Sequence, residues 1–166
     1  MHLFAAHTSV SGMESMRELH SEIEIDAPVE RVWKILTDFP QFSDWNPFVT
    51  QAAGEVRDGA RLRVRIEPPG GRAMTFTPTV VRSVRNEELC WLGRLLLPGV
   101  FDGEHAFRLS LTTNGGTRFV QREQFRGLLV PLLWKSVSTN TKRGFEAMNR
   151  ALKERAEALT DRRHEP

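Results

Sequence analysis

The feature that most constrains the fold is a change in hydrophobic period near the C-terminus. Before residue 127, apolar and polar residues mostly alternate, which is typical of strands with one buried face. From about residue 132 to 159, apolar side chains recur every three or four residues, as on one face of a helix. This predicted helix would be roughly 40 Å long. A long amphipathic helix that follows a run of strands must bury its apolar stripe against their sheet.

The segments before this helix predict an α+β domain. After Pro28, the residues Val29, Val32 and Leu36 fall at helical spacing and predict a short helix. A second short helix or turn is predicted within residues 38–48, where aromatic residues mix with helix breakers. Strands joined by short turns imply an antiparallel sheet. Its seven predicted strands comprise residues 18–25, 53–57, 61–67, 73–84, 88–96, 101–113 and 117–126.

Composition and charge narrow the class of protein. Hydrophobic residues make up 40% and charged residues 27% of the 166 residues, as in globular domains. The net charge of +2 comes without a one-sided basic stripe, so we expect no nucleic-acid partner. No apolar run reaches about 18 residues, so we expect no integral membrane association. The single cysteine, Cys90, fits a reducing compartment, and we expect a cytoplasmic protein.

Motifs for a metal or a cofactor are missing from the sequence. The five histidines have no paired-ligand spacing and Cys90 has no cysteine partner, so we expect no metal site. No strand–Gly-x-Gly-x-x-Gly–helix segment supports a nicotinamide or flavin, so we expect no cofactor. Cys90 alternates with Leu89 and Trp91 in a predicted strand, which favours a buried structural cysteine over a reactive one.

Several segments of the chain resemble one known family of proteins. They are IDAPVERVW at 25–33, LTDF at 36–39, WNP at 45–47, LCW at 89–91, PGVFDGEH at 98–105 and GGT at 115–117. Together with the order of predicted elements, they resemble the START-related (SRPBCC) superfamily. That superfamily includes birch pollen allergen-like and polyketide cyclase/dehydrase-like proteins. The resemblance covers a domain at about residues 17–160 and leaves tails at 1–16 and 161–166.

The resemblance implies a helix-grip fold, in which a curved seven-stranded antiparallel sheet wraps around the long C-terminal helix. It also implies two short helices after the first strand and an internal, mostly apolar cavity between sheet and helix. We expect Trp45 and Phe48 at the cavity entrance. The predicted wall comprises Leu62, Val64, Met74, Phe76, Trp91, Phe107, Leu109, Phe119, Gln121, Val137, Thr141, Phe145 and Met148. The alternative is that these side chains simply form the core.

Three polar side chains are candidates for catalysis in that cavity. Alternation puts Glu123 on the same strand face as Phe119 and Phe125. A carboxylate there must be paired, hydrogen-bonded or protonated, and it could act as a general acid or base. His105 is expected near Glu123 on the paired strand, where the two could form a proton relay. Arg94, near the end of its strand, could meet a ligand carboxylate or enolate.

Each of these candidates also has a simpler interpretation. Glu123 could pair with a neighbouring arginine such as Arg94 or Arg108, since structural ion pairs use the same residue types. His105 could be a hydrogen-bonded residue at a strand end, and Arg94 could lie in water at the rim. A register slip of one residue would turn both Glu123 and His105 outward.

Three functions remain open, because this fold supports many activities. The favoured one is binding of a hydrophobic small molecule, such as a lipid, polyketide or aromatic metabolite, by a carrier or sensor. The alternative is a polyketide cyclase/dehydrase-like enzyme that uses acid–base catalysis in the same cavity. The third is a protein-interaction domain, in which the apolar loops 95–100 and 128–134 bind a protein or join a homodimer.

Overall fold

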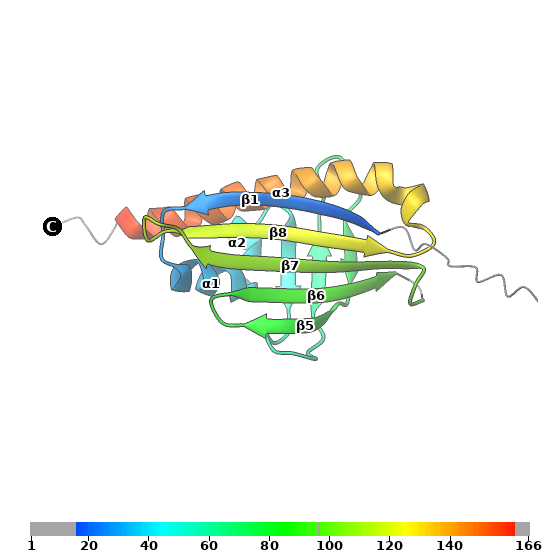
Figure 1. Ribbon diagram of the computed structural model, residues 1–166, viewed down its shortest axis with the longest axis horizontal. Helices are drawn as coiled ribbons and strands as arrows, with labels where there is room; N and C mark the ends of the chain where they lie inside the picture. Colours follow the sequence, from blue (N-terminus) through cyan, green and yellow to red (C-terminus); the bar gives the residue numbers. More distant parts are fainter. Residues whose placement is uncertain (1–15, 96, 162–166) are drawn as a thin grey trace, which may run out of the picture.

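The computed structural model describes residues 16–95 and 97–161, with side chains up to residue 158 (Figure 1). His2, His7 and His164, and almost all of the two predicted tails, lie outside the described residues. The helices are α1 (Val29–Thr37), the 3₁₀ helix η1 (Phe39–Gln41), α2 (Phe42–Trp45) and α3 (Val130–Asp161). The strands are β1 (Arg17–Ile25), β2 (Val49–Ala53), β3 (Arg63–Ile66), β4 (Met74–Phe76), β5 (Thr79–Val84), β6 (Glu88–Leu95), β7 (Phe101–Leu111) and β8 (Thr117–Arg126).

The strands form two antiparallel sheets that face each other across the core. One sheet has five strands in the order β1-β8-β7-β6-β5, and the other has three in the order β2-β3-β4. Figure 1 shows α3 running along β1, with α1, α2 and the three-stranded sheet behind the five-stranded one. We call the face of the five-stranded sheet that points into this space the inner face, and the opposite face the outer face.

The prediction of seven strands in one sheet was wrong, because the segment 73–84 is two strands. β4 pairs with β3, whereas β5 pairs with β6. Between them, Pro78 has no N–H for a ladder, and its carbonyl accepts a hydrogen bond from the backbone N of Leu62 at 2.8 Å. The backbone N of Val80 donates to the carbonyl of Ala60, and the backbone N of Gly59 donates to the carbonyl of Val80, both at 2.8 Å, which also links the two sheets at this point.

The predicted strand at 53–57 was also misplaced. Oδ1 of Asn46 accepts hydrogen bonds from the backbone N of Phe48 at 3.0 Å and of Val49 at 2.9 Å. These bonds turn the chain directly from α2 into β2, so the strand begins earlier than the sequence pattern indicates. Residues after β2 form a turn, in which the backbone N of Arg57 donates to the carbonyl of Glu55.

The long helix α3 is packed unevenly along its length. In its C-terminal half, Met148, Leu152 and Ala156 have no exposed surface. In its N-terminal half, Trp134 and Val137 are only half-buried. Val130 and Phe145 are also fully buried, so the poorly packed part of α3 is the stretch between them. Each fully buried large apolar side chain contributes roughly 1.5–3 kcal/mol to holding the helix against the core.

Gly144 lies where the backbone of α3 approaches the ring of Phe48. A Cβ atom at this position would lie 2.2 Å from Cδ2 of Phe48. Without a side chain at 144, the helix backbone can rest directly on the Phe48 ring.

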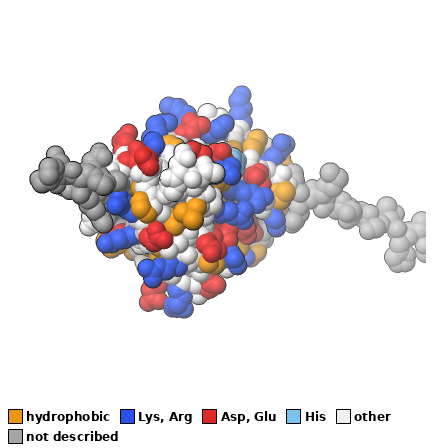
Figure 2. Space-filling view, turned by 60° about the vertical axis from the view of Figure 1, so that its left-hand side comes forward, with side chains coloured by type: hydrophobic (Ala, Val, Ile, Leu, Met, Phe, Trp, Pro, Cys, Tyr) orange, Lys and Arg blue, Asp and Glu red, His pale blue; other side chains and the backbone are white. Residues whose placement is uncertain are grey.

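The surface of the described residues carries mixed charge. Figure 2 shows basic and acidic side chains interspersed over the face that it presents. Within residues 16–95 and 97–161, no helix is both long and apolar enough to cross a membrane.

Candidate functional site

The inner face of the five-stranded sheet carries a row of side chains from neighbouring strands. Trp91 on β6 pairs with His105 on β7, and His105 pairs with Glu123 on β8. His105 is only 4% exposed. Its ring centroid lies 4.3 Å from that of Phe107, 4.8 Å from Phe145 and 5.6 Å from Trp91. His105 is therefore enclosed by aromatic rings from both the sheet and α3.

The carboxylate of Glu123 lies at the edge of this enclosure. Its Oε2 is 3.6 Å from Nδ1 of His105, and the Glu123 side chain is 17% exposed. Gly103 makes room for it, since a Cβ at Gly103 would lie 2.9 Å from Oε1 of Glu123. On the other side of the imidazole, Nε2 is buried and has no hydrogen-bond partner among the described residues. A histidine held between a carboxylate and an apolar interior can accept and release a proton there.

Gln121 is a second buried polar side chain on the inner face, with no exposed surface. Its Nε2 donates to the backbone carbonyl of Phe145 at 3.1 Å and to Oδ1 of Asn149 at 2.7 Å. Because a carbonyl can only accept, the amide nitrogen must face α3. Its Oε1 is buried and lacks a partner in the described part of the chain. Buried polar atoms nearly always have partners, so Nε2 of His105 and Oε1 of Gln121 each mark a position suited to a ligand or a water.

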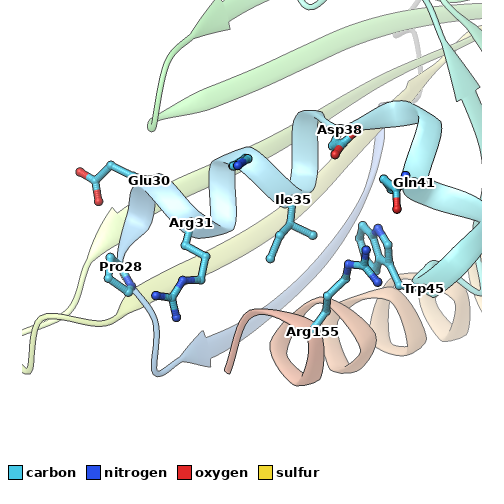
Figure 3. A pocket seen from close by; sticks show the side chains of 9 residues that line it. Pro28, Glu30, Arg31, Ile35, Asp38, Gln41, Trp45 and Arg155 are labelled. Atoms are coloured by element: carbon cyan, nitrogen blue, oxygen red, sulfur yellow. The ribbon is translucent and has the colours of Figure 1, made fainter. Parts of the chain in front are cut away.

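The space around His105 is occupied by side chains. The rings of Phe48 and Phe145 meet edge to face with centroids 5.7 Å apart, and both residues are buried. The open cavity expected from the family resemblance is therefore not seen beside His105. A ligand would have to displace the rings of Phe48 and Phe145 to bind there. A groove that the structure does describe lies elsewhere, between α1 and the C-terminal half of α3 (Figure 3).

The other predicted wall residues do not all surround His105. Those buried in the core are Leu62, Val64, Leu109, Phe119, Thr141 and Met148. Phe76 and Val137 are half-buried. Met74 is 54% exposed on β4, and Trp45 lines the groove between α1 and α3 instead. Their roles in ligand binding stay predictions.

Arg94 is not brought together with His105 and Glu123. Side chains alternate along a strand, so Arg94 projects from the face opposite to Trp91. Its Nε is 3.8 Å from Oδ2 of Asp102, and its side chain is 50% exposed. The geometry gives Arg94 no contact with the enclosed histidine.

The sequence analysis did not identify Asn149, which is hydrogen-bonded to Gln121, or Ser21, which is hydrogen-bonded to Asn149. Nδ2 of Asn149 donates to Oγ of Ser21 at 2.9 Å, which ties α3 to β1. Asn149 follows Phe145 by one helical turn on the buried face of α3, and it is only 3% exposed. A polar residue in the apolar stripe of a helix was the signal that could have identified it.

The described residues offer neither a reactive thiol nor a cluster of metal ligands. Burial, with a contribution from the charge of Glu104, raises the pKa of the Cys90 thiol to about 12. A thiol with such a pKa stays protonated at neutral pH and is a poor nucleophile. No three His, Cys, Asp or Glu side chains in the described ranges lie together in a way that could hold a metal ion.

Comparison with protein families gives the relationship of the whole domain. The family described as "Polyketide cyclase / dehydrase and lipid transport" matches residues 16–157. The chain belongs to this family. A search of curated protein sequences gave no significant match for this polyketide cyclase/dehydrase family member.

Solved structures show the same fold for the polyketide cyclase/dehydrase family member. The Zhui aromatase/cyclase from Streptomyces sp. R1128 has a TM-score of 0.71 and 17% identity, over 88% of this chain and 96% of that one. A START superfamily protein from Mycobacterium smegmatis has a TM-score of 0.68 and 21% identity, over 86% and 98%. The di-domain aromatase/cyclase StfQ of the steffimycin pathway has a TM-score of 0.70 and 14% identity, over 88% of this chain but only 52% of StfQ. The chain thus spans about half of the di-domain protein, and these identities support the fold alone.

Proposed function

We propose that this protein binds a hydrophobic small molecule between the five-stranded sheet and α3, as a carrier or sensor. The observation that carries the proposal is the pair of unpartnered buried atoms, Nε2 of His105 and Oε1 of Gln121. His105 lies among aromatic rings, which suits a mostly apolar ligand that presents one or two polar groups. A hydroxyl could donate to the Gln121 oxygen, and a carbonyl or hydroxyl could pair with the His105 nitrogen.

Access to this site requires side chains to move, because Phe145 and Phe48 fill the space beside His105. The looser packing of Trp134 and Val137 supports entry at the N-terminal half of α3. The free, buried Cys90 is compatible with the cytoplasmic location that we also propose.

The first experiment is native mass spectrometry of protein purified from its own host, followed by denaturing extraction. A discrete hydrophobic molecule at about one copy per chain would support the proposal. An empty protein that also fails to bind an apolar fluorescent dye would contradict it. The variant Trp91→Ala should weaken dye binding while the protein stays folded by circular dichroism, and unchanged affinity would remove Trp91 from the site.

A cyclase/dehydrase-like reaction is a second candidate function. It is favoured by the 3.6 Å approach of the Glu123 carboxylate to the buried imidazole of His105, which supplies an acid–base pair. In this case Glu123→Gln should leave binding near normal and abolish turnover of a polyketone substrate. Turnover that survives this substitution would exclude Glu123 as the acid or base.

Self-association is a third candidate. Leu97, Leu128 and Leu132 are 69%, 84% and 78% exposed. The two apolar loops are joined where the backbone N of Leu128 donates to the carbonyl of Gly99 at 3.1 Å. Sedimentation of the wild type and of Leu128→Ser would separate a dimer that uses these loops from a monomer.

A further inference from the structure

Four exposed leucines lie in the segments where β6 ends and α3 begins. Figure 1 shows that these two segments are at the same end of the molecule. Leu95 is 51%, Leu97 69%, Leu128 84% and Leu132 78% exposed. The hydrogen bond from the backbone N of Leu128 to the carbonyl of Gly99 holds the two segments together. We call the four leucines the leucine surface. Large exposed apolar side chains that gather in one place mark a binding surface more often than scattered ones do.

The chain around the start of α3 is basic. Arg126 ends β8 and Lys135 lies near the start of α3, and both side chains are exposed. Lys135 follows Leu132 by three residues, so the two side chains lie on the same side of the helix. From residue 124 to residue 145 the chain has four Lys or Arg and no Asp or Glu, although the net charge of the whole chain is only +2.

Two carboxylates on the strands that reach this end already face other groups. Oδ2 of Asp102 accepts a hydrogen bond from the backbone N of Gly99 at 3.2 Å, and it lies 3.8 Å from Nε of Arg94. Glu123 lies on the inner face, where its Oε2 is 3.6 Å from Nδ1 of His105. The charge of Asp102 is therefore balanced by Arg94, and Glu123 is turned toward the interior.

Two further carboxylates act on an arginine of the outer face. Glu18 accepts a hydrogen bond from Arg122 at 2.7 Å. This bond, with a smaller contribution from the charge of Glu104, raises the pKa of the Arg122 guanidinium. Arg126 and Lys135, by contrast, form no ion pair with an acidic side chain in the described part of the chain. Their charges remain available to an anionic partner.

We propose that the leucine surface docks this protein on a lipid bilayer that contains anionic headgroups. The leucines would enter the apolar layer, while Arg126 and Lys135 would lie among the headgroups. Trp134, which is half-buried between Leu132 and Lys135, is of the residue type that favours this interface. A second copy of the chain fits less well, because a two-fold contact through the leucines would bring the same cations of both copies together.

Docking on a bilayer does not require a ligand beside His105. It would, however, hold the poorly packed stretch of α3 with Trp134 and Val137 against the bilayer, where an apolar ligand could enter. Only this consequence rests on the function proposed above.

The test is co-flotation of the full chain with vesicles of equal parts phosphatidylcholine and phosphatidylserine, compared with vesicles of phosphatidylcholine alone. We expect binding to the anionic vesicles to be about tenfold stronger and to weaken as salt is added. Leu128→Ser should weaken it about tenfold, because a large apolar side chain is lost from the bilayer. Lys135→Gln should weaken it about fivefold.

The matched controls lie at the opposite end of the five-stranded sheet. Leu111, at the end of β7, is 70% exposed, and Arg85, in the turn after β5, is an exposed cation. Leu111→Ser and Arg85→Gln should bind the anionic vesicles like the wild type. Binding of an apolar dye in the interior should stay unchanged in Leu128→Ser, so the two proposals can fail separately.

Four results would overturn the proposal. They are a wild type that does not bind the anionic vesicles, unchanged binding by Leu128→Ser with a native circular dichroism spectrum, an equal loss in Leu111→Ser, and a wild-type dimer in sedimentation that Leu128→Ser dissociates. The last result would assign the leucine surface to a second copy of the chain. Leu97→Ser, from the other loop, takes the place of Leu128→Ser if that variant does not fold.

Discussion

The two faces of the five-stranded sheet differ in how most of their polar groups are paired. On the outer face, Glu88 accepts hydrogen bonds from Arg108, at 2.7 Å, and from Arg82. Glu18 accepts one from Arg122 in the same manner, at 2.7 Å. Each of these carboxylates thus has a guanidinium partner on a neighbouring strand or a strand end, in positions that water can also reach.

On the inner face, by contrast, Nε2 of His105 and Oε1 of Gln121 are buried without partners in the described residues. A buried donor or acceptor without a partner costs about 1–3 kcal/mol. An apolar core residue would avoid that cost at either position. Asp102 on the outer face is an exception, because its Oδ1 is also buried without a partner in the described residues. In the function proposed above, the polar groups of the inner face would meet the ligand, whereas the ion pairs of the outer face stabilise the fold.

The largest effect is expected from removing the ring that covers the inner polar groups. Phe145 has no exposed surface and contacts both His105 and Phe48. The variant Phe145→Ala should lower the free energy of unfolding by about 3–5 kcal/mol, because it leaves a cavity. Urea denaturation measures this, and Leu111→Ala, at a position that is 70% exposed, is the control with little change. A loss below about 1 kcal/mol would mean that the ring is not part of a packed core.

A smaller effect of opposite sign is expected when the inner polar pair is replaced by apolar groups. The double variant His105→Phe/Glu123→Leu should be more stable to urea than the wild type by about 1 kcal/mol, since buried pairs often contribute less than well-packed apolar side chains. The same variant should lose ligand binding. Each single variant should be less stable than the double one, because it leaves one partner buried and unpaired. A double variant that is clearly less stable than the wild type would assign the pair a structural role.

The smallest effect is expected on the outer face. Burial opposes ionisation of Glu88, but hydrogen bonds and charges from Arg108 and Arg82 outweigh it and lower the pKa of this carboxyl from its ordinary value of 4.5. Glu88→Gln should therefore lower the free energy of unfolding at pH 7 by up to about 1 kcal/mol.

This contribution of Glu88 depends on pH in a defined direction. Because its pKa is lower in the folded protein, the contribution is complete above the ordinary value of 4.5 and disappears as the pH falls through the folded-state pKa. Urea midpoints of wild type and Glu88→Gln should converge between pH 4.5 and the acid limit of the folded protein. Glu55→Gln, at a side chain that is 72% exposed, is the matched control. A difference that persists unchanged into acid would contradict the assignment.

The sequence pattern predicted the elements well where one periodicity runs without interruption. The alternation of β7 and β8 and the turn at 114–116 predicted that His105 and Glu123 would be neighbours, since a tight turn fixes the register of its hairpin. The contact between them is present at 3.6 Å. The predicted helix at 132–159 corresponds to α3 (Val130–Asp161) for the same reason.

What the sequence could not predict depends on groups that are distant along the chain. The division of segment 73–84 follows from the bond between Pro78 and Leu62, and the start of β2 follows from the side chain of Asn46. Whether the interior is open or filled depends on how Phe145 and Phe48 meet, which no local pattern encodes. The position of Trp45 in the outer groove likewise depends on how α1 and α3 pack together.

The division at Pro78 has a mechanical consequence. The strands β1, β8, β7, β6 and β5 form one continuous hydrogen-bonded sheet. In the described part of the chain, the backbone hydrogen bonds that join the three-stranded sheet to it lie at residues 59–62 and 78–80. Of the two sheets that enclose the interior, we therefore expect the five-stranded one to be the more rigid and the three-stranded one to be the more easily displaced. We expect a bulky ligand to be accommodated by an outward tilt of β2, β3 and β4. The spacing of His105, Gln121 and Glu123 on the five-stranded sheet would then stay unchanged.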